Sequence, residues 1–154
     1  MPGTRQGNRK GTYVVFMTLP DDSEINVGSL GRIFLKAGDY CYVGSAMNGL
    51  DQRVRRHLSN QKNIRWHIDY ITSLAINMEA YVSECPGSVP ECKIAEVATS
   101  LGFGPTVKGF GSSDCRCYCH LLSVPDAGKI SLVESLGMKP LEPIFACARE
   151  WESL

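Results

Sequence analysis

Two tyrosines, an arginine and a histidine stand in an order that could support the hydrolysis of a phosphodiester. Tyr13 begins a long apolar run, Tyr42 lies near the end of a second strand-like run, and Arg53 and His57 follow four residues apart. Cleavage of a phosphodiester needs a base that activates water and cationic groups that stabilise charge on the phosphoryl oxygens. It usually also needs a divalent metal held by a carboxylate. The chain offers residues of all three kinds.

The two tyrosines are expected on one face of an antiparallel sheet. Side chains alternate along a strand, so Tyr42 and Gly44 share a face, and pairing with the run that contains Tyr13 would place Tyr13 beside Tyr42. A tyrosine has a pKa of about 10, so it acts as a base at neutral pH only where positive charge favours its ionised form. We expect Arg53 and a metal to supply that charge, and Gly44 to let the backbone approach a phosphate.

Arg53 and His57 flank an apolar stripe on a helix predicted over residues 48–58, with Asn48 suited to cap its N-terminus. The stripe consists of Leu50, Val54 and Leu58. Arg53 and His57 are therefore expected at the edge of the buried face, where a cleft can open, and Arg56 on the outer flank. The planar guanidinium of arginine can hold two phosphate oxygens at once.

These pieces, together with later ones, resemble a known nuclease signature. The order Gly11-Thr-Tyr13, Tyr42-Val-Gly44, Arg53, His57 is similar to that of the GIY-YIG nucleases, in which two tyrosines on neighbouring antiparallel strands face a helix that bears an arginine. Three further segments of the chain resemble, more narrowly, an uncharacterised GIY-YIG-like branch that is sometimes fused to endonuclease III. They are Trp66-His-Ile-Asp69, Glu91-Cys92 and Gly109-Phe-Gly-Ser-Ser-Asp-Cys-Arg-Cys117. The resemblance spans residues 10–124.

The resemblance implies catalytic roles for four residues. It implies that Tyr42 activates water, that Tyr13 is its partner, that Arg53 clamps the phosphate, and that His57 is a second proton or phosphate contact.

A glutamate on a later helix would bind one Mg²⁺ or Mn²⁺ ion by the same resemblance. Glu91 is favoured because its Glu-Cys context matches the narrower branch, whereas Glu96 better matches the distance to Pro105 in many nucleases of this kind. The two glutamates cannot share a helix face at this spacing. The asparagine that such nucleases carry after that proline has no clear counterpart, which keeps open a catalytically inactive nucleic-acid-binding module as the alternative function.

Basic residues gather in the first part of the chain. Residues 1–67 contain ten Lys or Arg and five Asp or Glu, a balance of 10 − 5 = +5, while the whole chain is neutral. A polyanion responds to the local electrostatic field. The basic part of the chain can therefore bind DNA although the net charge of the whole chain is zero. We expect DNA contacts from Gly44, Ser45, Arg56, Lys62 and Arg65.

A cluster of cysteines suggests a second kind of site, a structural zinc site. In an extended segment Cys115, Cys117 and Cys119 point the same way, His120 follows, and Cys92 or Cys85 could supply a further thiolate to a structural Zn²⁺. The spacing is not that of the usual zinc pairs, so buried free thiols are the favoured interpretation. A zinc-stabilised interaction domain is the third candidate function.

Length and composition favour one globular domain. The 154 residues are 44% hydrophobic and 21% charged, close to the soluble average. Strand patterns fall at 11–19, 24–27, 32–35, 40–44, 78–82 and 118–124, and helix patterns at 48–58, 64–74, 91–101 and 129–136. We predict an α/β (α+β) fold with a central, mainly antiparallel sheet flanked by helices. Residues 1–10 would form a flexible basic arm, 11–124 the nuclease-like domain, and 125–154 a C-terminal extension packed on it or trailing it.

No apolar run approaches the roughly 20 residues that cross a bilayer, and the N-terminus lacks the apolar stretch of a secretory signal. We therefore expect no membrane partner and a cytoplasmic protein, with access to the nucleoid or nucleus. The predicted function is a Mg²⁺- or Mn²⁺-dependent DNA endonuclease that is selective for DNA structure and linked to repair or recombination.

Overall fold

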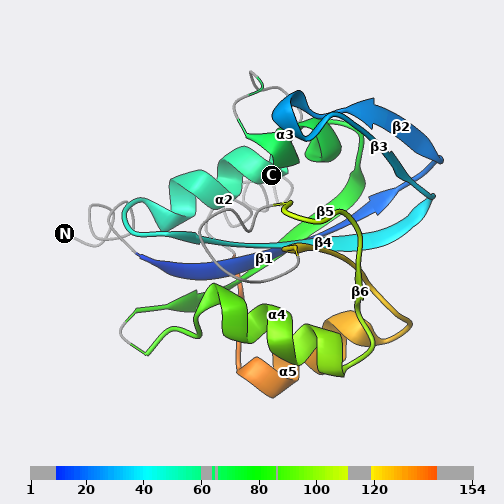
Figure 1. Cartoon of the computed structure of the whole chain (residues 1–154). Coiled ribbons are helices and arrows are strands. Elements are labelled where there is room, and N and C mark those ends of the chain that lie inside the picture. The colour runs from blue at the N-terminus through cyan, green and yellow to red at the C-terminus, as the bar shows by residue number, and fades with distance from the viewer. Residues whose placement is uncertain (1–9, 60–63, 65, 86, 111–118, 142–154) are drawn as a thin grey trace, which may run out of the picture.

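A six-stranded antiparallel sheet organises the computed structural model, which describes residues 10–59, 64, 66–85, 87–110 and 119–141. The strand order is β6-β7-β4-β1-β5-β8. The strands are β1 (Gly11–Leu19), β4 (Gly38–Ala46), β5 (Ile76–Glu84), β6 (Gly104–Pro105), β7 (Leu121–Ser123) and β8 (Lys139–Pro140). The predicted fold class, a single α+β domain with an antiparallel sheet and flanking helices, is confirmed (Figure 1).

β1 lies inside the sheet, between β4 and β5, as its apolar run predicts. Eight of its nine residues are buried, because both faces of the strand are covered. β-Branched and aromatic side chains favour this environment, and a strand without polar interruption is typical of the middle of a sheet.

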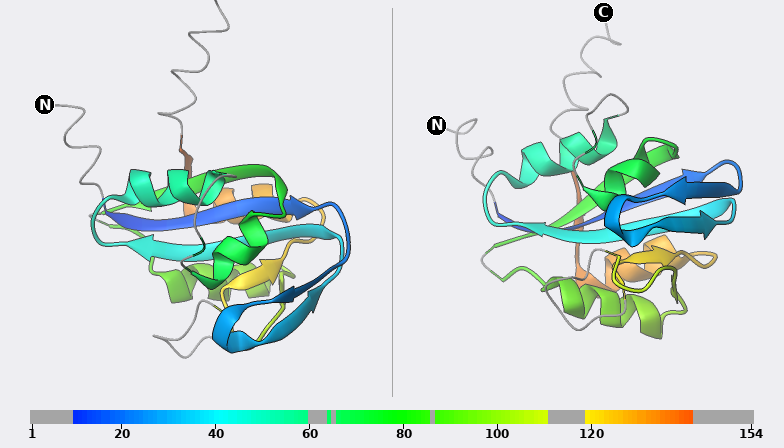
Figure 2. Two further views of the ribbon diagram at one scale, coloured as in Figure 1. Left: turned by 90° about the horizontal axis from the view of Figure 1, so that it is seen from above. Right: turned by 45° about the horizontal axis from the view of Figure 1, so that its top comes forward.

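Helices cover both faces of the sheet (Figures 1 and 2). α2 (Leu50–Leu58) and α3 (His67–Thr72) lie on one side, and α4 (Glu91–Ser100) and α5 (Gly128–Leu136) on the other. The side chains that fill the two interfaces form one buried core, which includes Leu50 and Val54 of α2 and Ile94 of α4. The apolar stripe predicted for the first helix is therefore the face that packs on β1 and β5.

Two helices begin or end differently from the prediction. α2 begins at Leu50, with Gly49 at its N-cap in the left-handed conformation (φ 71°), so the expected cap by Asn48 is wrong. Glycine takes this conformation without steric cost. α3 is shorter than the predicted 64–74, because Trp66 is its N-cap and Ser73 its C-cap.

Smaller elements complete the chain. A separate hairpin, β2 (Ser23–Asn26) with β3 (Arg32–Leu35), is joined by the 3₁₀ turn η1 (Gly28–Leu30), and β2 and β3 match the predicted strands to within one residue. β6 lies between the helix pattern at 91–101 and the strand pattern at 118–124, where the sequence predicts no strand. Pro140 lies in β8 at the edge of the sheet, where a residue without an N–H donor is tolerated.

The free end of β4 determines where a site can form. β7 pairs only with Tyr40–Tyr42 of β4, so in the described part of the chain no strand pairs with the outer edge of β4 from Val43 to Ala46. Alternation along β4 directs Tyr42 and Gly44 toward α2 and Ser45 toward the opposite face. Side chains from both layers can therefore meet at this edge.

No helix in the described residues is both long enough and apolar enough to span a bilayer.

Candidate active site

A polar cavity of about 360 Å³ opens at this end of β4. Tyr13, Tyr42, Gly44, Ser45, Arg53, His57 and Glu91 all line it, together with Trp66, His67 and Gly109. The structure thus brings together seven of the predicted site residues from β1, β4, α2 and α4. Lys62 and Arg65 lie outside the described residues.

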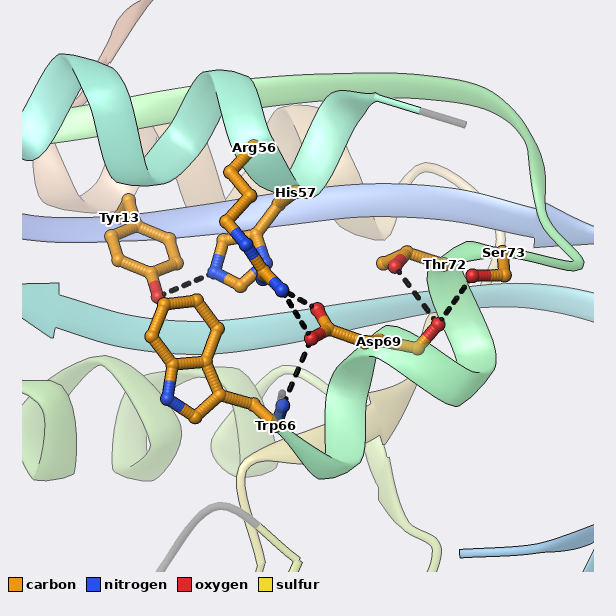
Figure 3. Close-up of polar contacts among 7 residues, drawn as sticks. All are labelled: Tyr13, Arg56, His57, Trp66, Asp69, Thr72 and Ser73. Atoms are coloured by element: carbon orange, nitrogen blue, oxygen red, sulfur yellow. Dashed lines mark hydrogen bonds and ion pairs between the residues drawn. The ribbon is translucent and has the colours of Figure 1, made fainter. Parts of the chain in front are cut away.

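Tyr13 and His57 form the buried floor of the cavity. The Tyr13 hydroxyl lies 2.8 Å from His57 Nε2, and the two residues are only 3% and 1% exposed (Figure 3). Burial raises the pKa of Tyr13, and the neighbouring Tyr42 adds to that rise. Neutral Tyr13 and the imidazole therefore hold each other in a fixed orientation. His57 is fully buried and not at the edge of the buried face, but it does line a cavity, as expected.

Tyr42 stands beside Tyr13, as the strand pairing predicts. Tyr13 pairs with Gly44 and Val15 with Tyr42, so the two tyrosines are diagonal neighbours on one face, with ring centroids 6.5 Å apart. Burial and the charge of Glu91 raise the pKa of Tyr42 to about 12, although Arg53 acts in the opposite direction. The expectation that Arg53 lowers this pKa is correct in sign, but burial and Glu91 outweigh it.

Gly44 has a role that the sequence did not suggest. A Cβ atom at this position would collide with the hydroxyl and ring atoms of Tyr13. Gly44 is therefore required because the Tyr13 ring lies across the backbone of β4, which lets Tyr13 reach His57. The predicted contact between Gly44 and a phosphate stays a prediction.

Arg53 projects from α2 toward the end of β4. Its Nη1 donates a hydrogen bond of 2.8 Å to the carbonyl oxygen of Ser45, and its Cζ lies 5.0 Å from the centroid of a Trp66 ring. The guanidinium is half-buried and acts on the pKa values of both tyrosines and of Glu91. Arg53 is thus the arginine of the polar cavity.

Arg56 is directed elsewhere. It donates two hydrogen bonds, of 2.9 and 2.8 Å, to the carboxylate of Asp69, which is fully buried and also accepts the backbone N–H of Trp66 (Figure 3). The expected place of Arg56 on an outer flank is wrong, because a buried carboxylate requires a charged partner. Its predicted DNA contact has no support from this geometry, since Arg56 does not line the cavity.

Glu91 reaches the cavity from the opposite layer. Its Oε2 accepts a hydrogen bond from the Ser45 hydroxyl, and its Oε1 lies 3.1 Å from Nδ1 of His120. Burial raises the pKa of Glu91, but hydrogen bonds from His120 and Ser45 and the charges of His120 and Arg53 outweigh it, so the net shift is downward. Glu91 is therefore ionised at neutral pH and partly accessible, with its side chain 28% exposed.

His120 is a site residue that sequence reasoning did not connect with Glu91. It stands directly before β7 and is 1% exposed, and its backbone N–H donates to the carbonyl oxygen of Phe110. The sequence places His120 beside the cysteines, where it is a candidate zinc ligand. Only its proximity to Glu91 in the fold identifies it, and no sequence spacing encodes that proximity.

Glu96, the alternative metal ligand, lies on the outer surface of α4. Its side chain is 71% exposed and pairs with Lys93 at 3.1 Å. The structure therefore places Glu91, and not Glu96, with the tyrosines and Arg53.

The predicted cysteine cluster is only partly described, because Cys115 and Cys117 lie outside the described residues. Cys119 is buried, and its thiol accepts from the N–H of Thr106 and donates to the carbonyl oxygen of Leu121. Cys92 is exposed at the start of α4. Within the described ranges, no three His, Cys, Asp or Glu side chains come together as a metal site built wholly from protein side chains, such as a structural zinc site, would require.

Comparison with known proteins places the chain in a family. The family model described as "Domain of unknown function DUF123" matches residues 12–138. The chain belongs to the DUF123 family. The matched region contains every residue that lines the polar cavity, together with α5. Neither the curated proteins nor the solved structures that were searched contain a match.

Proposed function

We propose that this DUF123 protein is a divalent-metal-dependent DNA endonuclease. The observation that carries the proposal is the meeting of Tyr42, Arg53 and Glu91 in one polar cavity, although they come from a strand and from helices on opposite faces of the sheet. The resemblance to the GIY-YIG signature supports the same chemistry. The +5 balance of residues 1–67 supports a polyanionic substrate.

A divalent cation fits the donors that the cavity offers. Mg²⁺ is commonly held by one or two carboxylates and keeps several waters and substrate phosphates as its other ligands. Glu91 is ionised, partly accessible and held in place by Ser45 and His120, so it can serve as such a carboxylate. A cation bound there would supply Lewis-acid stabilisation of the phosphoryl oxygens.

The protein's own residues would hold the phosphate and move the proton. Arg53 would hold phosphoryl oxygens in the charge-assisted manner typical of guanidinium groups. Tyr42 in its ionised form would accept the proton of the attacking water at its phenolic oxygen. Burial opposes the ionised form of Tyr42 most strongly, followed by the charge of Glu91 and then by the charge of Asp69. Neutralisation of the Glu91 charge removes the second of these three effects. Tyr13, fixed by His57, would orient the attacking water beside Tyr42.

A cleavage assay tests the proposal. Flapped, nicked and duplex DNA are incubated with Mg²⁺ or Mn²⁺ and the wild-type protein, Tyr42→Phe or Arg53→Ala. Tyr40→Phe is the matched control, because Tyr40 lies on the same strand but its hydroxyl donates to the carbonyl oxygen of Lys36, outside the cavity. We expect cleavage by wild type and Tyr40→Phe, preferably of the flapped or nicked DNA, and little or none by the other two.

Two outcomes would contradict the proposal. Salt-sensitive binding without cleavage of any substrate would favour the inactive nucleic-acid-binding module. Equal cleavage by wild type, Tyr42→Phe and Arg53→Ala would show that the activity arises elsewhere.

A further inference from the structure

A second cavity, of about 410 Å³, adjoins the polar one at the same end of the sheet. The two cavities share Ser45 and Glu91 as lining residues. Since Ser45 and Glu91 are joined by a hydrogen bond, this pair forms the boundary between the two cavities. The two cavities are therefore neighbours, and Ser45 and Glu91 can contact ligands in both.

The second cavity has mainly apolar walls. Met47, Cys85, Pro90 and Cys92 contribute to them, and Met47 is 75% exposed. The polar groups nearby are largely engaged with each other. The Thr12 hydroxyl donates to the carbonyl oxygen of Val89 at 2.6 Å, and Ser88 Oγ lies 3.0 Å from Cys85 Sγ. The walls of the second cavity can therefore provide a ligand with apolar contact area but few hydrogen bonds.

Charge distinguishes the ligands of the two cavities. Among the residues that the structure describes, Glu91 is the only charged one that lines the second cavity, whereas Arg53 lines the polar cavity. A phosphate is therefore attracted to the polar cavity and repelled from the second. An uncharged group suits the second cavity better, and the thioether of Met47 can make favourable contacts with an aromatic ring. Its volume lies within the roughly 300–1,000 Å³ typical of small-ligand sites.

We propose that this second cavity is a subsite for the base of an unpaired nucleotide next to the phosphate at Arg53. The inference rests on the proposed function and names the substrate class of the same site. A base in a duplex would have to leave its stack to enter, at a cost that is least for an unpaired base. The subsite therefore gives the protein a preference for unpaired DNA.

Binding without metal tests the subsite separately from cleavage. The probe is a fluorescein-labelled single-stranded hexanucleotide in EDTA, measured by anisotropy and compared with versions in which one internal nucleotide is abasic. We expect at least a fivefold loss of affinity at one abasic position and smaller losses elsewhere. The sensitive position should lie beside the bond that is cut when Mg²⁺ is added.

Met47→Ala provides the matched change in the protein. Met47 is so exposed that its truncation should alter the free energy of unfolding by less than about 0.5 kcal/mol. We expect Met47→Ala to bind the intact and abasic strands with equal affinity. Phe34→Ala, which removes another exposed apolar side chain (57%) outside both cavities, should keep the wild-type discrimination.

The outcomes separate the two proposals. Salt-sensitive binding or cleavage that is indifferent to every abasic position overturns the subsite alone. Unchanged discrimination in Met47→Ala also overturns it. Absence of both binding and cleavage overturns the proposed function and the subsite with it.

Discussion

Arg53 and Arg56 lie one turn apart on α2 and contact the same indole, yet their surroundings differ. Arg53 Cζ is 5.0 Å and Arg56 Cζ 4.4 Å from the Trp66 ring. Arg56 is bound through two hydrogen bonds to Asp69, which is fully buried. Arg53 donates to a backbone carbonyl and shares its cavity with Glu91, which is 28% exposed.

The burial of the partner carboxylate therefore decides what each arginine can do. A buried carboxylate without a cation is strongly unfavourable, so Arg56 is committed to Asp69. Figure 3 shows this pair linking α2 to the start of α3. Arg53 faces a carboxylate that is partly solvated, and a phosphate can approach it. Helical spacing alone predicts similar surroundings for Arg53 and Arg56. The sequence therefore does not show which of the two is bound to a buried carboxylate.

Breaking the buried pair should have the largest effect. Asp69→Ala would leave Arg56 half-buried without its carboxylate and remove an acceptor of the Trp66 N–H, so we expect a loss of about 3–5 kcal/mol in the free energy of unfolding. Chemical denaturation measures this loss. In the control, Glu24→Ala removes an exposed pair with Arg32 and should cost less than about 1 kcal/mol. Similar losses in both variants would refute the structural role of Asp69.

Truncation of Arg53 and truncation of Arg56 should have different effects. On the proposed function, Arg53→Ala should lower kcat for DNA cleavage by about 10²–10³, because it removes the group that we propose stabilises transition-state charge. Its effect on stability should be small beside that of Arg56→Ala, which leaves Asp69 uncompensated. Paired measurements of kcat and denaturation midpoint check this. The comparison fails if Arg56→Ala impairs cleavage without lowering stability.

Glu91 should depend on His120 for its orientation. His120→Ala is expected to weaken Mn²⁺ binding by roughly 10–100-fold, as is common when a residue that orients a metal ligand is lost. His120→Asn should bind more tightly than His120→Ala, because its amide nitrogen can replace Nδ1 as donor. Titration with Mn²⁺, followed by electron paramagnetic resonance, measures both. Identical affinities in wild type and His120→Ala would contradict this role.

High pH should destabilise the protein through ionisation of the buried Tyr42. The pKa of Tyr42 is raised to about 12 in the fold, so its contribution to stability is complete below its unfolded value and is lost as the pH rises between the two. From pH 10 to 11.5 we expect the wild type to lose about 1–2 kcal/mol more of its unfolding free energy than Tyr42→Phe. Urea denaturation at the two pH values measures the difference. Parallel losses would show that Tyr42 is not desolvated.

Much of the fold follows from local patterns. The uninterrupted apolar run of β1 predicts a central strand, and the stripe on α2 predicts the face that packs on the sheet. The same patterns bring Tyr13, Tyr42 and Arg53 together, because alternation and helical spacing act over short distances. A local pattern was wrong where backbone conformation decided the outcome, as at Gly49.

The remaining features depend on contacts between distant segments. Asp69 lies 13 residues beyond Arg56, and His120 lies 29 residues beyond Glu91. Gly44 resembles a phosphate-binding glycine in sequence, yet the Tyr13 ring explains it. Such roles follow from the burial and pairing of side chains, which a single sequence does not display.

The most direct test of the central claim compares two glutamates of α4. Flapped DNA is incubated with Mg²⁺ and the wild type, Glu91→Gln or Glu96→Gln, each at a concentration where the folded state is verified by circular dichroism. Our account predicts cleavage by the wild type and by Glu96→Gln, and a loss of at least about 100-fold in Glu91→Gln. Cleavage by Glu91→Gln at the wild-type rate, or no cleavage by the wild type, would contradict it.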